Sequence, residues 1–142
     1  MSYLTNEQRV ALFEMRSAMD GYVDSVKEVP AEINTHMSAI RVWKPGVFNA
    51  GDVRMHEGNP YKCAQAHDST NNPDWNPVAA PALWSQYHGT TPETARPYIA
   101  PTGAHDMYLA GEYMIWTDGA VKHCTEDTAY GPDVWPQAWE DV

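Results

Sequence analysis

Three histidines, two of them followed by an aspartate, are the residues best suited to acid–base or metal chemistry. His67 precedes Asp68, His105 precedes Asp106, and His123 lies in a strand-like segment. A His–Asp pair can orient a nucleophile, but no residue of this chain stands out as an activated nucleophile. No His-x-x-x-His or Cys-x-x-Cys pair provides the spacing of a metal site. We therefore interpret these residues as polar turn or strand residues, and expect no catalytic residue, no metal, no cofactor and no enzyme activity.

A small β module, which contains His67, is predicted for residues 41–88. Apolar and polar residues alternate over 53–56, at the two-residue period of a half-buried strand. A turn at 57–59 leads into a second strand that begins at 61. A module of this size has little aliphatic bulk, so large rings must supply most of its core. The rings expected there are Trp43, Tyr61 and Trp84.

The same pattern recurs after a polar, proline-containing linker at 89–100. Residues 109–116 repeat the Ala-Gly-acid-strand theme of 50–53, at an offset of 60 to 61 residues. The second module, 101–142, has diverged further, and Lys122 stands where the first has Tyr61. Its turn carboxylates are interpreted as solvated residues: Asp118, Glu126 and Asp127.

The first 40 residues have a helical pattern instead. Thr5 and Gln8 have the spacing of a capping box, which predicts a helix starting at Asn6. Pro30 ends this helix or starts the next, and a second short helix is expected over 31–40. Apolar residues at alternating steps of three and four form a stripe over two heptads. The stripe consists of Leu12, Met15, Met19, Tyr22 and Val26.

An isolated helix of this length is marginally stable, so its stripe must be buried against something. In one interpretation the segment is a helical hairpin folded on itself or on the β modules. In the other it is an anchor that oligomerises or docks onto a larger assembly. If the helices form parallel coils, we expect a homo-oligomer, with a trimer as first choice and a dimer as second.

The predicted fold is therefore mainly β with an N-terminal α segment. A helical anchor (1–40) precedes two small antiparallel three-stranded β modules in tandem (41–88 and 101–142), joined by the linker 89–100. The two cysteines, Cys63 and Cys124, occupy matching places in the two modules. We expect free, buried thiols; a disulfide between the modules or a metal site is the alternative.

Composition excludes two classes of partner. A net charge of −10 with nine Lys and Arg argues against binding a nucleic-acid backbone, which requires clustered cations. No apolar run approaches the roughly 20 residues of a membrane span, so no membrane insertion is expected. No basic-then-apolar signal segment opens the sequence, and we expect synthesis in a cytoplasm.

The module residues Trp43, Asn49 to Val53, Gly58, Tyr61 and Trp84 resemble the chitin-binding type-3 domain, that is, carbohydrate-binding module families 5 and 12. The longer pattern over 61–67, 74–77 and 80–84 resembles a branch found in small proteins of tailed bacteriophages. In that branch a short helical segment precedes the module and a degenerate second module follows it. All three parts are present here, so the resemblance covers nearly the whole chain.

In such modules sugars stack on exposed aromatic rings, and nearby polar groups contact the hydroxyls. Trp75 lies in a turn-rich loop where a ring is hard to bury, and Trp135 lies in a similar loop of the second module. Trp116 is a third candidate, on a face that the sequence leaves open. Packing against their own loops is the competing interpretation for these indoles. Two adjacent tryptophans common in chitin-binding members are replaced here by Gln65 and Ala66, so chitin specificity is not carried over.

The resemblance implies a bacteriophage virion accessory protein, a fibre or decoration protein on the capsid or tail. Its helical segment would contact other virion proteins, and its modules would adhere weakly and multivalently to host-surface polysaccharide. A purely structural decoration or fibre protein, whose modules bind other virion proteins, is the first alternative. A targeting module of a polysaccharide-degrading enzyme is the second, against which the lack of a catalytic domain argues.

Overall fold

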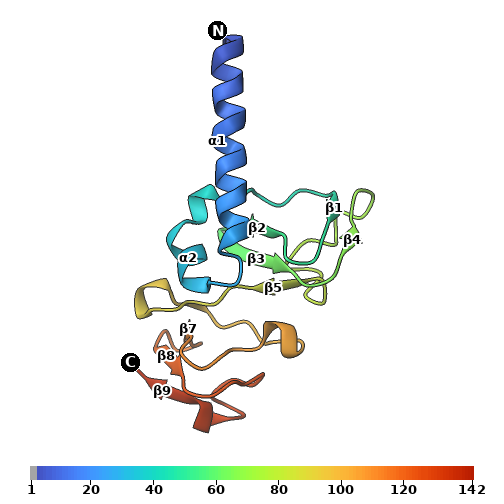
Figure 1. Cartoon of the computed structure of the whole chain (residues 1–142). Coiled ribbons are helices and arrows are strands. Elements are labelled where there is room, and N and C mark those ends of the chain that lie inside the picture. The colour runs from blue at the N-terminus through green and yellow to red at the C-terminus, as the bar shows by residue number, and fades with distance from the viewer. Residues whose placement is uncertain (1–2) are drawn as a thin grey trace.

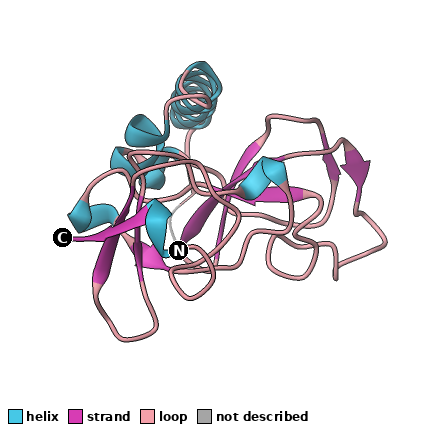
Figure 2. Ribbon diagram, turned by 90° about the horizontal axis from the view of Figure 1, so that it is seen from below, coloured by secondary structure: helices cyan, strands magenta, loops and turns pink. Residues whose placement is uncertain are grey.

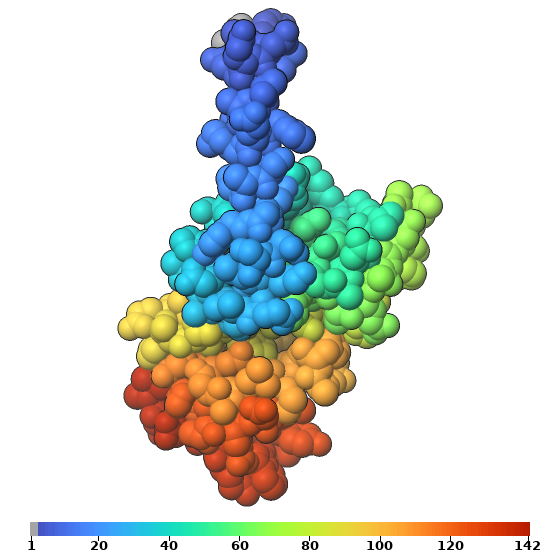
Figure 3. All heavy atoms as spheres, viewed as in Figure 1, coloured from blue at the N-terminus to red at the C-terminus, as the bar shows by residue number. Residues whose placement is uncertain are grey.

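The long helix α1 (Asn6–Ser25) begins at the predicted residue. The structure, a computed structural model, describes residues 3–142. Thr5 caps the helix: its hydroxyl accepts from the Gln8 backbone N–H at 3.1 Å, and the Gln8 side chain accepts from the Thr5 N–H at 2.8 Å. The N-terminal half of α1 stands clear of the rest of the molecule as a narrow column (Figures 1 and 3).

The second helical segment is shorter than expected. Helix α2 (Pro30–Thr35) starts at the proline and is followed by the 3₁₀ turn η1 (Met37–Ala39), in place of one helix over 31–40. Proline fits the first turn of a helix because its missing N–H would be unpaired there. Ile33 and Ile40 are both buried, so this segment packs its isoleucines into the core.

The first module contains the three-stranded antiparallel sheet that was predicted. Strand β2 (Val53–His56) pairs with β3 (Asn59–Cys63), and β3 pairs with β5 (Trp84–Gln86). The hairpin between β2 and β3 turns through Glu57 and Gly58, both with positive φ, which suits the right-handed twist of the strands. A separate two-stranded ribbon forms from β1 (Val47–Phe48) and β4 (His67–Asp68).

The second module differs from the predicted three-stranded antiparallel sheet. Its sheet has four strands in the order β6 (Arg96–Pro97), β7 (Tyr113–Ile115), β8 (Val121–Cys124) and β9 (Trp139–Asp141). Strand β6 runs parallel to β7. Pro97 has no backbone N–H to donate, which is tolerated in β6 because this strand lies at the edge of the sheet. Two 3₁₀ turns, η2 (Pro92–Thr94) and η3 (Ala104–Asp106), precede β7, and a third, η4 (Pro136–Ala138), leads into β9.

The two modules repeat each other in their hydrogen bonds. The Gly51 N–H donates to the Cys63 carbonyl and the Gly111 N–H to the Cys124 carbonyl, both at 2.8 Å. In each module the cysteine pairs across the sheet with a buried indole, Trp84 or Trp139. Figure 2 shows the two groups of strands seen along the helix axis. The architecture, mainly β with an N-terminal helix, is the one predicted.

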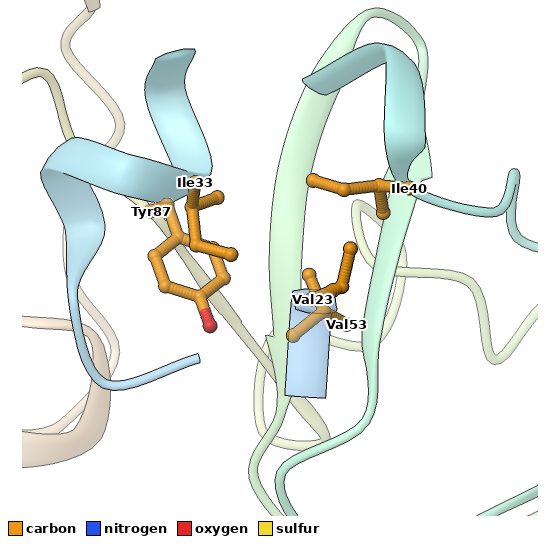
Figure 4. Close-up of a cluster of buried hydrophobic side chains, with 5 residues drawn as sticks. All are labelled: Val23, Ile33, Ile40, Val53 and Tyr87. Atoms are coloured by element: carbon orange, nitrogen blue, oxygen red, sulfur yellow. The ribbon is translucent and has the colours of Figure 1, made fainter. Parts of the chain in front are cut away.

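Three separate clusters of buried side chains hold the molecule together. One is shared by the helices and the first module and contains Val23 of α1, Ile33 of α2, Val53 of β2 and Tyr87 (Figure 4). The other two lie inside the first and the second module, around Trp84 and Tyr108 respectively. The C-terminal half of α1 is therefore fixed to the first module by apolar packing.

Candidate binding surfaces

Trp75 is held at the surface by a loop with little regular structure. The Asn72 N–H donates to the Ser69 carbonyl at 2.8 Å, and the Trp75 N–H donates to the Asn72 carbonyl at 3.0 Å. The Asn76 side chain accepts from two following backbone N–H groups, those of Val78 and Ala79. These local bonds satisfy the loop backbone without a sheet partner, because Asn side chains readily mimic a turn. Trp75 is left 41% exposed.

The exposed ring is connected to the core of its module through His67. The His67 imidazole lies 5.7 Å from the buried Trp84 ring and 6.4 Å from Trp75, edge to face in both cases. Phe48 completes the cluster, 5.0 Å from Trp84. Trp75 is thus an exposed indole that is joined through His67 to a packed cluster of rings.

Trp135 has the equivalent position in the second module and is 43% exposed. Its backbone N–H donates to the Gly131 carbonyl at 2.9 Å, and its indole Nε1–H donates to Glu126 Oε1 at 2.6 Å. Trp75 and Trp135 belong to different modules and share no ring contact within residues 3–142. They are two separate surfaces.

Trp116 is packed against its own module. Its ring lies 5.0 Å from Tyr98, and a Cβ added at Gly131 would come within 2.9 Å of it. The residue is half-buried beside the core around Tyr108. The structure therefore separates this candidate from the two exposed indoles and gives it a packing role.

The histidines considered for chemistry have structural partners. His67 Nδ1 is 2.7 Å from the Gln65 carbonyl, His105 Nε2 is 2.8 Å from the Pro81 carbonyl, and His123 Nδ1 is 2.7 Å from Glu140 Oε1. Asp68 accepts from Thr70, which holds the pKa of its carboxyl below the usual value. No three side chains of His, Cys, Asp or Glu in the described part of the chain are grouped so as to hold a metal ion.

The stripe on α1 is only partly covered. Val23 is the helix residue buried against the first module, whereas Met19 and Val26 of the predicted stripe are half-buried beside it. Leu12 and Met15 are exposed, on the part of α1 that rises above the body. Tyr22 is covered at one edge by α2, where its hydroxyl donates to Glu32 at 2.7 Å. Between residues 3 and 142, neither helix is long and apolar enough to span a membrane.

Tyr130 is not among the binding residues predicted from the sequence. This residue is 57% exposed and lines the same hollow as Trp135 and Glu126. The internal repeat offered little help in finding it, because the residue that aligns with it in the first module is Ser69, which is fully buried.

Residues 42–85 match the model of carbohydrate-binding module family 5/12. The match covers the first module, from the residue before Trp43 to β5, and includes Trp75. The family resemblance predicted for this stretch is therefore supported, and it describes a binding module.

Among curated proteins none is significantly similar to the chain. Among solved structures, the crystal structure of a family GH18 chitinase from Chromobacterium violaceum is similar, with 27% identity and a TM-score of 0.32. The similarity covers 43% of this chain and 16% of the chitinase, so the chain spans less than a fifth of that protein's length.

Proposed function

We propose, from the family match of residues 42–85, that the chain is a glycan-binding adhesion protein whose first module contacts sugar through Trp75. The observation that carries this proposal is the exposure of a Trp75 ring supported by packed aromatic side chains. The flat C–H face of a pyranose stacks on such a ring. With Gln65 and Ala66 in place of the family's paired tryptophans, the contact area is small and single-site binding is weak.

Weak single sites favour a multivalent setting. We propose that the chain is a bacteriophage virion accessory protein, made in the host cytoplasm and displayed on the virion surface as a capsid- or tail-attached fibre or decoration. Its resemblance to small tailed-phage proteins supports this role. Many linked copies would convert weak contacts with host-surface polysaccharide into avid adhesion without additional contacts per site.

The free part of α1 is proposed to attach or assemble the chain. Leu12 and Met15 are exposed residues of α1, and the N-terminal half of that helix forms the projecting column in Figure 3. Apolar residues in that pattern form the seam of a coiled coil. Contact with other virion proteins or with copies of the same chain would cover them. We expect a parallel trimer first and a dimer second, and the four-part division of the chain remains a prediction.

Sugar binding is tested by retention of the full chain on insoluble polysaccharides. Trp75→Ala should lower retention about tenfold or more, because aromatic anchors of this kind contribute about 2 kcal/mol. Val78→Ala, an exposed change in the same loop, is the matched control and should bind as the parent. Near-ultraviolet circular dichroism checks that both variants are folded. No retention on any polysaccharide by the parent chain would overturn the proposal.

Assembly is tested by sedimentation velocity. A double change, Leu12→Glu with Met15→Glu, should convert an oligomer to a monomer, because charges at seam positions repel and remain hydrated. Val10→Glu is the matched control: Val10 is also exposed but lies about 200° around the helix from Leu12. Equal masses for the parent and both variants would contradict self-assembly through this stripe.

A purely structural decoration or fibre protein is the second candidate, favoured by Gln65 and Ala66 at the family's usual platform. Its modules would bind other virion proteins. Trp75→Ala particles that adsorb to host cells as well as the parent would favour this role over adhesion.

A further inference from the structure

The second module has a groove of about 420 Å³, and Trp75 is not among the residues that line it. Two rings, Tyr130 and Trp135, line it together with the carboxylates of Glu126 and Asp127. Both rings are more than 40% exposed, so their faces are open to solvent. The volume lies within the roughly 300–1,000 Å³ of small-ligand sites. The groove lies outside the stretch matched by the family model.

Hydrogen bonds fix the two carboxylates in place. Glu126 Oε1 accepts from the Trp135 indole at 2.6 Å, and its backbone carbonyl accepts from the Cys124 thiol at 3.0 Å. Asp127 Oδ1 accepts from the Ala110 N–H at 2.9 Å. Across residues 3–142, neither carboxylate forms an ion pair, and the second oxygen of each has no hydrogen-bond donor. Two fixed anions with unused acceptor capacity are thus presented beside two rings.

The first module shows that the shared backbone does not require these groups. Its Cys63 thiol donates to the Gln65 carbonyl at 3.1 Å, just as Cys124 does to Glu126. Gln65 and Ala66 therefore correspond to Glu126 and Asp127, in segments of the same local structure. Neither residue of the first module carries a charge, so the paired carboxylates are a property of the second module alone.

The chemistry of the groove selects its ligand. A pyranose ring can stack on Tyr130 or Trp135, and a carboxylate accepts hydrogen bonds from hydroxyl or ammonium groups. Paired anions repel uronates and phosphates but attract an ammonium, which also interacts favourably with an indole face. A net charge of −10 adds attraction for cationic polymers.

We propose that this groove binds amino sugars with a free ammonium group, such as de-N-acetylated glucosamine units of a polysaccharide. This inference rests on the proposed glycan-binding function and names the sugar class for the second module. The ammonium contacts Glu126 and Asp127 while the sugar ring stacks on Trp135 or Tyr130.

Calorimetry on the full chain with two probes tests the proposal. A glucosamine hexamer should bind at least about tenfold more tightly than an N-acetylglucosamine hexamer, because charge-assisted hydrogen bonds are the stronger ones. That preference should shrink in 0.5 M salt, since exposed charges are screened. Equal affinity for the two hexamers would overturn the proposal.

The decisive variant is the double change Glu126→Gln with Asp127→Asn. Each amide keeps the acceptor oxygen used by Trp135 or Ala110, so the fold is preserved while both charges are removed. The expected result is loss of the tenfold preference for the glucosamine hexamer over the N-acetylglucosamine hexamer. Trp135→Ala should weaken binding of the glucosamine hexamer about tenfold, by removing the stacking surface. Retention of full affinity by both variants would contradict the groove assignment.

Two controls separate the possible failures. If Trp75→Ala abolishes glycan binding while the groove variants do not affect it, the proposed function stands and this inference fails. If the chain binds no glycan at all, the proposed function fails first. A hexalysine peptide is the third probe: affinity equal to that for the glucosamine hexamer would identify a basic peptide rather than a sugar as the ligand.

Discussion

Cys63 and Cys124 are equivalent residues whose thiols are free and buried, as the sequence predicted. Burial raises the pKa of both thiols, that of Cys124 to about 11. At pH 8 the thiolate fraction of Cys124 is then on the order of 10⁻³, and a thiol that is neither ionised nor accessible is chemically inert. Their role is to fill the sheet interior opposite Trp84 and Trp139.

We expect Cys124 of the folded chain to react with a thiol reagent at pH 8 about 100-fold more slowly than Cys124 of the denatured chain. The raised pKa also affects stability. Because the folded-state pKa of Cys124 exceeds its ordinary value of 9.0, its contribution is complete below about pH 9 and is lost as the pH rises through 11. Denaturant unfolding at pH 7, 9 and 11 should show this decline, and Cys124→Ala should reduce it. A parent protein equally stable at all three pH values would contradict the assignment.

At the scale of elements, the helix and the segment after the first module differ in how closely they are packed. Gly21 lies in α1, where an added Cβ would have no atom within 4 Å apart from the neighbouring backbone of the helix itself. Gly89 lies between the modules, where an added Cβ would come within 2.6 Å of the Thr94 carbonyl oxygen. Gly89 also bridges to Tyr113 of β7. The start of the predicted linker is therefore part of a tightly packed sheet edge.

Alanine at these two glycines should have opposite effects. Gly21→Ala should stabilise the chain by up to about 1 kcal/mol, because glycine is a poor helix former. Gly89→Ala should destabilise it by about 2 kcal/mol, because backbone atoms must move to admit the methyl group. Denaturant unfolding of both variants measures the difference. A Gly89→Ala protein as stable as the parent would show that the junction is loosely packed.

In the molecule as a whole, buried polar contacts join the parts of the chain that carry the three separate hydrophobic clusters. His88 lies at the end of the first module, and its Nδ1 atom is hydrogen-bonded to Glu112 Oε1 of the second at 2.8 Å; both side chains are buried. The His88 ring stacks on Tyr108 at 3.7 Å. Arg96 of β6 bonds both to Asn34 of α2 and to the Tyr87 carbonyl. Polar groups from all three parts of the chain thus meet at one buried junction.

Removing His88 should therefore be costly. His88→Ala leaves the buried Glu112 carboxylate without its ring partner and with only the Leu109 backbone N–H as a donor, and is expected to destabilise the chain by about 3 kcal/mol. The matched control is His123→Ala, which breaks the His123–Glu140 pair at 2.7 Å on the exposed side of β8. That change should cost less than about 1 kcal/mol. Similar losses of unfolding free energy for both variants in denaturant unfolding would contradict a stabilising role for the buried junction.

Much of the fold was determined by signals within a few residues. The Thr5–Gln8 capping box placed the start of α1, and alternation with a Gly58 turn placed β2 and β3. Repetition at a spacing of 60 to 61 residues indicated a second module with its own buried cysteine. These features could be predicted because helix caps, turns and strand periodicity depend on near neighbours.

Contacts between distant residues were decided only by the tertiary structure. The fourth strand β6, the buried His88–Glu112 junction and the covering of Trp116 by Gly131 each join residues that local patterns do not relate. The exposed groove of Tyr130 and Trp135 is another such case, since its carboxylates had the appearance of ordinary turn residues. The sequence determined the long helix and the β2–β3 hairpin, whereas packing decided which further strands form and which surfaces remain open, because burial depends on what the rest of the chain brings against each side chain.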